Sequence, residues 1–168
     1  YMLSYAVFTR VNFVHNLTMK QVLDIALQVT ELLEQAHRRG ATYLDHKLLH
    51  YYWNEPRQKV IMVDWNIGHW QPEKLQPEVQ QFDLLQFSAR ALHHLFTGRQ
   101  APGSVAVGPN RPEDIANSPR HFEAFYSYEV QRRLNDEEMR FLEKALDGSF
   151  KSAAEMHEQL QVLYNKRL

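Results

Sequence analysis

The chain contains 168 residues, 44% of them hydrophobic and 12% aromatic, which is enough to bury one good core but would leave two full domains cramped. Lys and Arg number 19 and Asp and Glu 20, so the net charge of -1 lacks the basic excess that nucleic-acid backbones require. Without cysteine the chain cannot form disulfides, a catalytic thiol or Cys-based zinc sites, and no apolar run reaches the length of a membrane span. We therefore expect a single cytoplasmic domain, and Tyr1 in place of an initiator Met indicates an excerpt of a longer polypeptide.

The first element in chain order is a long core helix, predicted from Thr18 to about Arg39. Thr18 stands three residues before Gln21, which is the spacing of a capping box, and apolar residues then recur at helical intervals. Gly40 follows as the residue whose left-handed conformation ends the helix. We assign Gly40 a structural role for this reason.

Two short apolar runs follow, at residues 48–53 and 59–63, and the polar residues between them predict a β-hairpin. This hairpin is the only sheet that we expect. Residues 69–82 are polar, contain two prolines and predict a loop. Residues 84–96 are almost all apolar and predict a helix that is buried on every side.

The C-terminal part begins with an irregular connector, rich in Pro and Gly, over residues 100–120. Two further capping boxes, Asn135 with Glu138 and Ser152 with Glu155, then open two helices. The expected fold class is therefore mainly α, with one small β-hairpin in the middle of the chain.

Five segments of the chain carry a resemblance to a known family: ALQVTELLEQAHRRG, TYLDHKLLH, KVIMVDWN, FDLLQFSARALHHLFTGR and ALDGSFKSAAEMHEQLQVL. In this order they resemble the helix before the catalytic loop, the loop H-R-D-x-K-x-x-N, the strand leading into D-F-G, the central buried helix and the last two helices of a bacterial-type serine/threonine protein kinase. The resemblance starts near the hinge, at YMLSYAV, and covers essentially the whole chain. It implies one kinase-like C-terminal lobe over residues 1–168, with no N-terminal lobe in the chain. This lobe comprises a hinge-like segment (1–17), a catalytic-loop to central-helix region (18–100) and C-terminal helices (101–168).

The resemblance also assigns roles by position. Asp45 matches the catalytic base, Lys47 the cation that touches the transferring phosphate, and Asp64 the metal-binding Asp of D-F-G. The metal-binding Asn of the catalytic loop is replaced by His50, whose nitrogen suits magnesium poorly. A second metal ion would therefore be badly held.

The segment after Asp64 departs furthest from the family. Glu73, which matches the end of the activation segment, follows Asp64 by nine positions (73 minus 64), so no platform for a peptide substrate fits. Residues 65–82 contain no Ser, Thr or Tyr, and Leu44 has replaced the Arg that would pair with a phosphorylated residue. The resemblance therefore implies a catalytically inactive module, a pseudokinase that binds another protein, or a neighbouring domain of its own polypeptide, in signalling. The alternatives are an atypical ATP-dependent protein phosphotransferase whose N-terminal lobe lies outside this chain, and a purely structural spacer.

The retained residues also have a structural interpretation. Asp45, Lys47 and Asp64 can serve only to brace the loop, as vestigial positions that bind no cofactor; ATP and magnesium belong to the phosphotransferase alternative. Asp83 matches the family's Asp at the start of the central helix. We expect it to be buried and to accept backbone amides around residues 43–45, because a buried charge requires such partners. Asp83 is therefore given a structural role.

Glu73 and three groups of residues are weighed last. Glu73 is given a structural role with Gly40 and Asp83. His46 and His50 stand four apart on a loop-to-strand segment with no third ligand in evidence, so we expect no metal site there. The neighbouring His93 and His94 point to different sides of a helix and are expected to be packing or surface residues. The aromatic residues 51–53 are expected to pack in a strand first and to form a partner-binding surface second.

Overall fold

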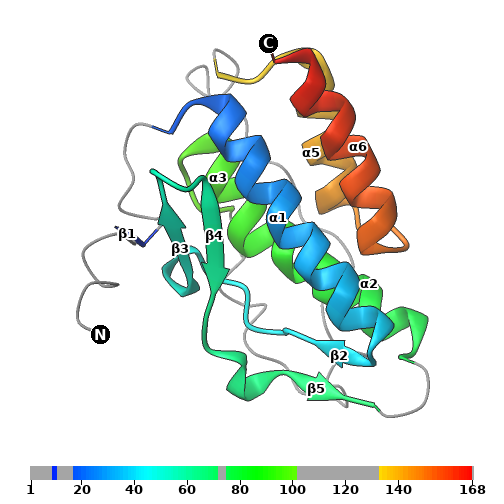
Figure 1. Ribbon diagram of the computed structural model, residues 1–168. Helices are drawn as coiled ribbons and strands as arrows, with labels where there is room; N and C mark the ends of the chain where they lie inside the picture. The colour runs from blue at the N-terminus through cyan, green and yellow to red at the C-terminus, as the bar shows by residue number, and fades with distance from the viewer. Residues whose placement is uncertain (1–8, 11–16, 72–74, 102–132, 168) are drawn as a thin grey trace.

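The structure, a computed structural model, describes residues 9–10, 17–71, 75–101 and 133–167. It is mainly helical, as the sequence predicts. Glu73, most of the hinge-like segment 1–17 and most of the connector 100–120 lie outside the described residues. In chain order (Figure 1) the elements are β1 (Thr9–Arg10), α1 (Met19–Arg38), β2 (Ala41–Thr42), the 3₁₀ turn η2 (Leu48–His50), β3 (Tyr51–Asn54), β4 (Lys59–Met62), the 3₁₀ turn η3 (Trp65–Ile67), β5 (His69–Trp70), α2 (Pro77–Phe87), the π-helical turn η4 (Ser88–Leu92), α3 (His93–Thr97), α5 (Asp136–Leu146) and α6 (Ala153–Lys166).

Helix α1 forms as predicted, and its capping box is complete. The Gln21 amide donates to Thr18 Oγ1 at 3.2 Å, and the Thr18 amide donates to Gln21 Oε1 at 2.9 Å. The helix ends at Arg38, and Gly40 adopts the left-handed conformation predicted for it, with φ of 77°. The Gln71 amide then donates to Gly40 O at 2.8 Å, next to the pairing of β2 with β5.

The central buried helix is also present, but it begins earlier than predicted. It runs from α2 through η4 into α3, so residues 77–82 are helical and the loop prediction was wrong there. Pro77 occupies the first turn, where its missing amide proton costs nothing and its fixed φ favours the helix. Phe82 is 1% exposed, so tertiary burial stabilises this first part of the helix.

The predicted hairpin is confirmed, with β3 and β4 antiparallel and Tyr52 opposite Ile61. The expectation that it would be the only sheet was wrong. Strand β1 adds to β3, and β2 pairs with β5 in a second small sheet. These extra strands are two residues long, too short for any alternation of apolar and polar residues to appear in the sequence.

The two C-terminal helices have the predicted caps. Asn135 accepts the Glu138 amide at 2.9 Å, and Glu138 accepts the Asn135 amide at 2.9 Å, so this box is complete. Ser152 accepts the Glu155 amide at 3.1 Å, but the Glu155 carboxylate bonds the amide of Lys151, so the second predicted box is only half formed.

The helices enclose the main core. Helix α1 packs most extensively against α6. In Figure 1 the central helix lies behind α1, and the β3–β4 hairpin covers one end of the core. A smaller cluster joins Leu44 to Leu75, Val79 and Phe82. Within the described ranges, no helix combines the length and apolar character needed to cross a bilayer.

Candidate functional site

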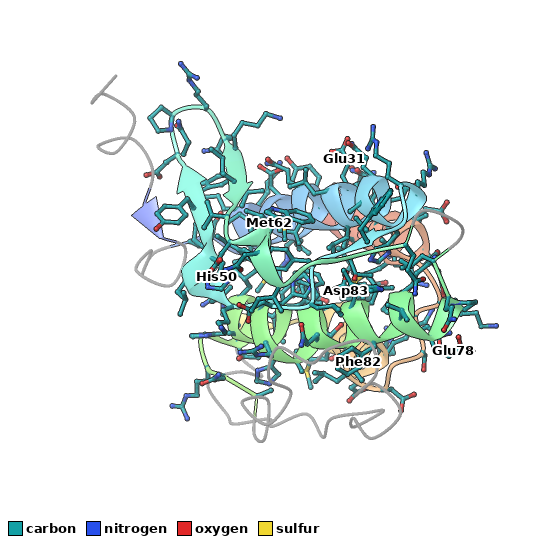
Figure 2. The ribbon with its side chains drawn as sticks, turned by 90° about the horizontal axis from the view of Figure 1, so that it is seen from below. Glu31, His50, Met62, Glu78, Phe82 and Asp83 are labelled. Carbon is teal, nitrogen blue, oxygen red and sulfur yellow. The ribbon has the colours of Figure 1, made fainter. Side chains whose placement is uncertain are left out.

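The loop between β2 and η2 is anchored by hydrogen bonds to the side chain of Asp83 in α2. Asp83 is fully buried, and its Oδ2 accepts the Tyr43 amide at 3.0 Å while its Oδ1 accepts the Leu44 amide at 2.8 Å. These are the backbone bonds that the sequence predicted. Figure 2 shows Asp83 on the central helix, on the side that faces α1. The central helix therefore fixes the backbone on which the candidate site is built.

Two histidines complete the surroundings of the Asp83 carboxylate. His37 Nε2 lies 2.8 Å from Oδ2, and His46 Nε2 lies 3.0 Å from Oδ1. Burial opposes ionisation of Asp83, but the hydrogen bonds from His37 and His46 outweigh it and hold the pKa of this carboxyl well below its usual range. Asp83 is thus a buried carboxylate with four donors around it.

His46 belongs to this buried cluster and not to a metal site. Burial lowers the pKa of His46, against the opposing effect of Asp83, so the ring is neutral and donates its Nε2 proton to that carboxylate. Its Nδ1 then accepts the hydroxyl proton of Tyr51, whose pKa burial raises well above the usual value. Both nitrogens of His46 are therefore engaged, away from His50.

Asp45 lies next to this cluster and forms ion pairs with Lys47 and Arg90. Lys47 Nζ lies 2.7 Å from Oδ1 of Asp45, and Arg90 places a guanidinium nitrogen 3.4 Å from the same oxygen. The Asp45 side chain is 2% exposed and that of Arg90 is 7% exposed, so the pair lies in a largely water-excluded environment. Arg90 belongs to the π-helical turn η4, a type of local irregularity that often occurs at functional sites.

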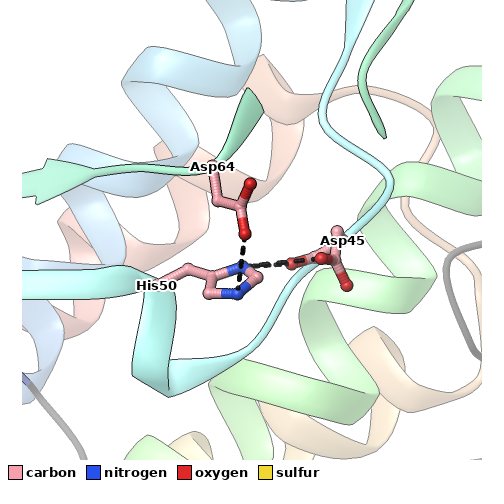
Figure 3. Close-up of side chains that lie close together, drawn as sticks. All are labelled: Asp45, His50 and Asp64. Atoms are coloured by element: carbon pink, nitrogen blue, oxygen red, sulfur yellow. Dashed lines mark hydrogen bonds and ion pairs between the residues drawn. The ribbon is translucent and has the colours of Figure 1, made fainter. Parts of the chain in front are cut away.

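His50 stands between Asp45 and Asp64 (Figure 3). Its Nδ1 lies 3.1 Å from the carbonyl oxygen of Asp45, so this nitrogen carries a proton, and its Nε2 faces Asp64 Oδ2 at 3.4 Å. An unprotonated ring nitrogen repels a carboxylate oxygen. A cation bound between the two groups would relieve that repulsion.

The three side chains Asp45, His50 and Asp64 form a group that could hold a metal ion, with one ligand atom from each within 4.8 Å of the others. One nitrogen and two carboxylates suit a transition metal better than magnesium. Such an ion would compete with Lys47 and Arg90 for the carboxylate of Asp45. From spacing alone only His46 and His50 were weighed as ligands, whereas the resemblance placed Asp45, His50 and Asp64 at positions of one site, and the tertiary fold brings these three together.

The backbone at the site is unusual at two positions. Leu44 and Asp64 have φ values of 56° and 66°, a left-handed conformation that costs a non-glycine residue about 1 kcal/mol or more. Leu44 is held there by Asp83, and its side chain packs in the cluster with Phe82. Tyr43 stabilises the backbone beside Asp64, because its hydroxyl donates to the carbonyl oxygen of Val63 directly after β4.

The fold brings four predicted site residues together: Asp45, Lys47, His50 and Asp64. Gly40 lies apart from them, at the end of α1. Sequence reasoning missed Arg90, the hydroxyl of Tyr43 and the contact of His37 with Asp83. Arg90 and His37 come from segments distant from Asp45 in the sequence, and the signal for Arg90 was a charged residue inside an otherwise apolar helix. Tyr43 is two positions from Asp45, but its hydroxyl reaches Val63 only in the folded chain.

The two other histidines considered are not ligands of this site. His93 is 1% exposed, and its Nδ1 contacts the carbonyl oxygen of Arg99 at 2.8 Å. Burial lowers the pKa of His93 and of His94. His93 is thus the packing residue that the sequence predicted.

No protein-family model matches the chain, and no curated protein matches it significantly.

Proposed function

We propose that this chain is a catalytically inactive module with the fold of a kinase C-terminal lobe, which acts by binding another protein. The observation that carries the proposal is the way Asp83 accepts the amides of Tyr43 and Leu44. This bond pattern is the one expected if residues 43–50 match the catalytic loop of the family. Asp45 and Asp64, separated by 19 positions in the sequence (64 minus 45), then meet at one site.

The electrostatics of Asp45 argue against catalysis. A catalytic base must accept a proton from a hydroxyl group that lies within hydrogen-bond distance of it. Both oxygens of Asp45 already contact Lys47, and Arg90 adds a second cation. With both oxygens in contact with these cations, Asp45 acts as a structural anion in our proposal.

An exposed row of apolar side chains supports the binding role. Starting in β4 and ending in β5, it consists of Ile61, Val63, Trp65, Ile67 and Trp70. Trp70 is the most exposed of them, at 65%. This stretch of chain lies on the side of the molecule away from α5 and α6 (Figure 1). Several exposed apolar residues gathered in ten positions are typical of an interaction surface.

The second candidate function is an atypical phosphotransferase. It is favoured by the group of Asp45, His50 and Asp64, because a metal ion held there could contact nucleotide phosphates. ATP binding that depends on a divalent metal ion, with magnesium as the ion that the family uses, separates the two candidates.

We expect the chain to show no kinase activity and no magnesium-dependent ATP binding tighter than about 1 mM. His50 offers nitrogen where magnesium prefers oxygen, and Asp45 is already paired with Lys47 and Arg90. Isothermal calorimetry with ATP and magnesium measures this directly. Micromolar binding that is lost in Asp64→Asn would replace our proposal with the phosphotransferase. Asparagine tolerates the left-handed backbone at this position, so this variant removes the charge alone.

Substitutions of Asp45 and Asp64 also report on the structural role of these carboxylates, with urea denaturation as the measurement. Asp45→Ala should lower the free energy of unfolding by about 1 to 3 kcal/mol, because Arg90 loses its buried partner. Asp64→Asn should change it by about 0.5 kcal/mol or less, because the side chain of Asp64 is 43% exposed.

We further expect the double variant Ile61→Ser, Ile67→Ser to weaken capture of the partner about tenfold while the domain stays folded. Both side chains are exposed, so the change removes apolar contact area without opening a cavity. Quantitative capture of proteins from cell extract on the immobilised chain measures the effect. Val162→Ser is the matched control, since Val162 is equally apolar, 52% exposed and lies on α6. If the double variant and Val162→Ser weaken partner capture equally, or if neither weakens it, the apolar row has no specific role in binding.

A further inference from the structure

The group of Asp45, His50 and Asp64 has a set of metal-binding atoms that the proposed function leaves unused. His50 comes from η2 and Asp64 from the segment after β4, and the three side chains meet with one ligand atom each within 4.8 Å of the others (Figure 3). Asp45 is 1% exposed and His50 is 6% exposed, so the surrounding protein fixes both side chains. Two of the three ligands are therefore ordered before any ion binds, which lowers the entropic cost of binding.

The ring of His50 is oriented by the hydrogen bonds of its Nδ1 atom. The carbonyl oxygen of Asp45, 3.1 Å away, can only accept a hydrogen bond. The hydroxyl of Tyr43, 3.2 Å away, gives its single proton to the carbonyl oxygen of Val63, so it also accepts from Nδ1. Nδ1 therefore carries a proton whatever the charge of the ring, and Nε2 is the nitrogen that can bind a metal ion. Metal-binding histidines are commonly oriented by a hydrogen bond from their other nitrogen in this way.

The distance between Nε2 of His50 and the carboxylate of Asp64 fits two ligands of one ion. Two atoms that each lie about 2.0 to 2.1 Å from a tetrahedral metal ion are about 3.4 Å apart. His50 Nε2 and Asp64 Oδ2 are 3.4 Å apart. Because the Asp64 side chain is 43% exposed, it can adjust to an ion, and water can reach the ion from the same side.

Asp45 can become the third ligand by exchanging one of its two cations for the ion. Lys47 Nζ lies 2.7 Å from Oδ1 and 3.0 Å from Oδ2, whereas Arg90 pairs with Oδ1 at 3.4 Å. The Lys47 side chain is 31% exposed, and its flexible stem lets the ammonium move into solvent. This movement frees Oδ2, which lies 3.7 Å from the ring of His50. Arg90 remains the partner of Oδ1, so the buried ion pair is kept.

We propose that Asp45, His50 and Asp64 bind a divalent transition-metal ion of the zinc type, and that they bind it without a nucleotide. Imidazole nitrogen together with carboxylate oxygen is a common donor set for zinc, whereas magnesium demands octahedral coordination by oxygen. This site goes beyond the proposed function, which needs no ion. It also differs from the phosphotransferase alternative, in which magnesium acts together with ATP.

The test titrates the whole chain with zinc and, separately, with magnesium, in the absence of nucleotide, by isothermal calorimetry and by the thermal midpoint. We expect zinc to raise the midpoint and to bind at least about 100-fold more tightly than magnesium. Asp64→Asn should weaken zinc about tenfold or more, because it removes a charged ligand while the exposed position and its left-handed backbone are kept. His50→Asn, which exchanges the ring nitrogen for an amide oxygen, should abolish the preference for zinc over magnesium.

Lys47→Gln distinguishes a metal site from three side chains that only brace the loop. It removes the cation that competes for Asp45, so zinc should bind about tenfold more tightly, although the chain loses an ion pair. His94→Gln is the control, because it removes a half-buried histidine of α3 that lies outside the group, and it should leave the zinc affinity unchanged. Zinc that binds no more tightly than magnesium, an unchanged zinc affinity in Asp64→Asn, or a zinc affinity that falls in Lys47→Gln would each overturn the proposal.

Discussion

Replacing Asp83 by alanine should lower the free energy of unfolding by about 3 to 5 kcal/mol, the cost of removing one partner from a buried charge cluster. The variant leaves four buried donors without an acceptor: the amides of Tyr43 and Leu44 and the rings of His37 and His46. The left-handed turn at Leu44 also loses the bond that holds it. Urea denaturation followed by circular dichroism measures the loss.

Asp83→Asn is the matched variant, because its amide keeps the shape and one accepting oxygen. We expect a smaller loss, about half that of Asp83→Ala, since one oxygen can still accept two of the four donors. A loss below about 1 kcal/mol for Asp83→Ala would mean that the loop does not depend on Asp83. It would remove the main support for our assignment of residues 43–50.

The pH dependence gives a second readout of the same cluster. Although burial opposes its ionisation, the bonds from His37 and His46 hold the pKa of Asp83 below the usual value of about 3.9. A carboxyl whose pKa is lower in the folded state stabilises the fold above its unfolded pKa, and this stability is lost as the pH falls toward the folded pKa. The wild-type chain should therefore lose more stability below about pH 4 than Asp83→Ala does.

Replacing Gly40 by alanine should lower the free energy of unfolding by about 3 kcal/mol or more, as the sum of two effects. The left-handed φ of 77° disfavours any side chain, and the added Cβ would stand 2.0 Å from the carbonyl oxygen of Gln71. That oxygen belongs to the backbone, so relief requires moving the Gln71 strand and breaking its 2.8 Å bond to Gly40 O. Thermal unfolding measures the loss.

Gly98→Ala separates the two effects. Gly98 has nearly the same φ, 73°, but among the described residues an added Cβ would meet only the side chain of Arg133, at 3.8 Å. We expect a loss of about 1 kcal/mol, which is the conformational cost alone. Equal losses for Gly40→Ala and Gly98→Ala would show that the strand at Gln71 moves aside without cost.

Short-range residue patterns account for the helix ends and the hairpin. The caps at Thr18, Asn135 and Ser152, the stop at Gly40 and the hairpin at β3–β4 depend on residues a few positions apart. Capping, left-handed glycine and strand alternation act over that distance, so the pattern of residues carries them. The interaction of Asp83 with the 43–44 amides was also predicted, but only through the resemblance that aligned these segments.

The tertiary structure alone decided the early start of the central helix, the short strands β1, β2 and β5, and the contents of the site. Phe82 and Val79 make residues 77–82 helical by being buried, although the segment is locally polar and begins with a proline. Arg90 reaches Asp45 across 45 positions (90 minus 45), and His37 reaches Asp83 across 46 (83 minus 37). A buried charge takes whatever partner the packing brings within a few ångströms, and no spacing along the chain encodes that distance.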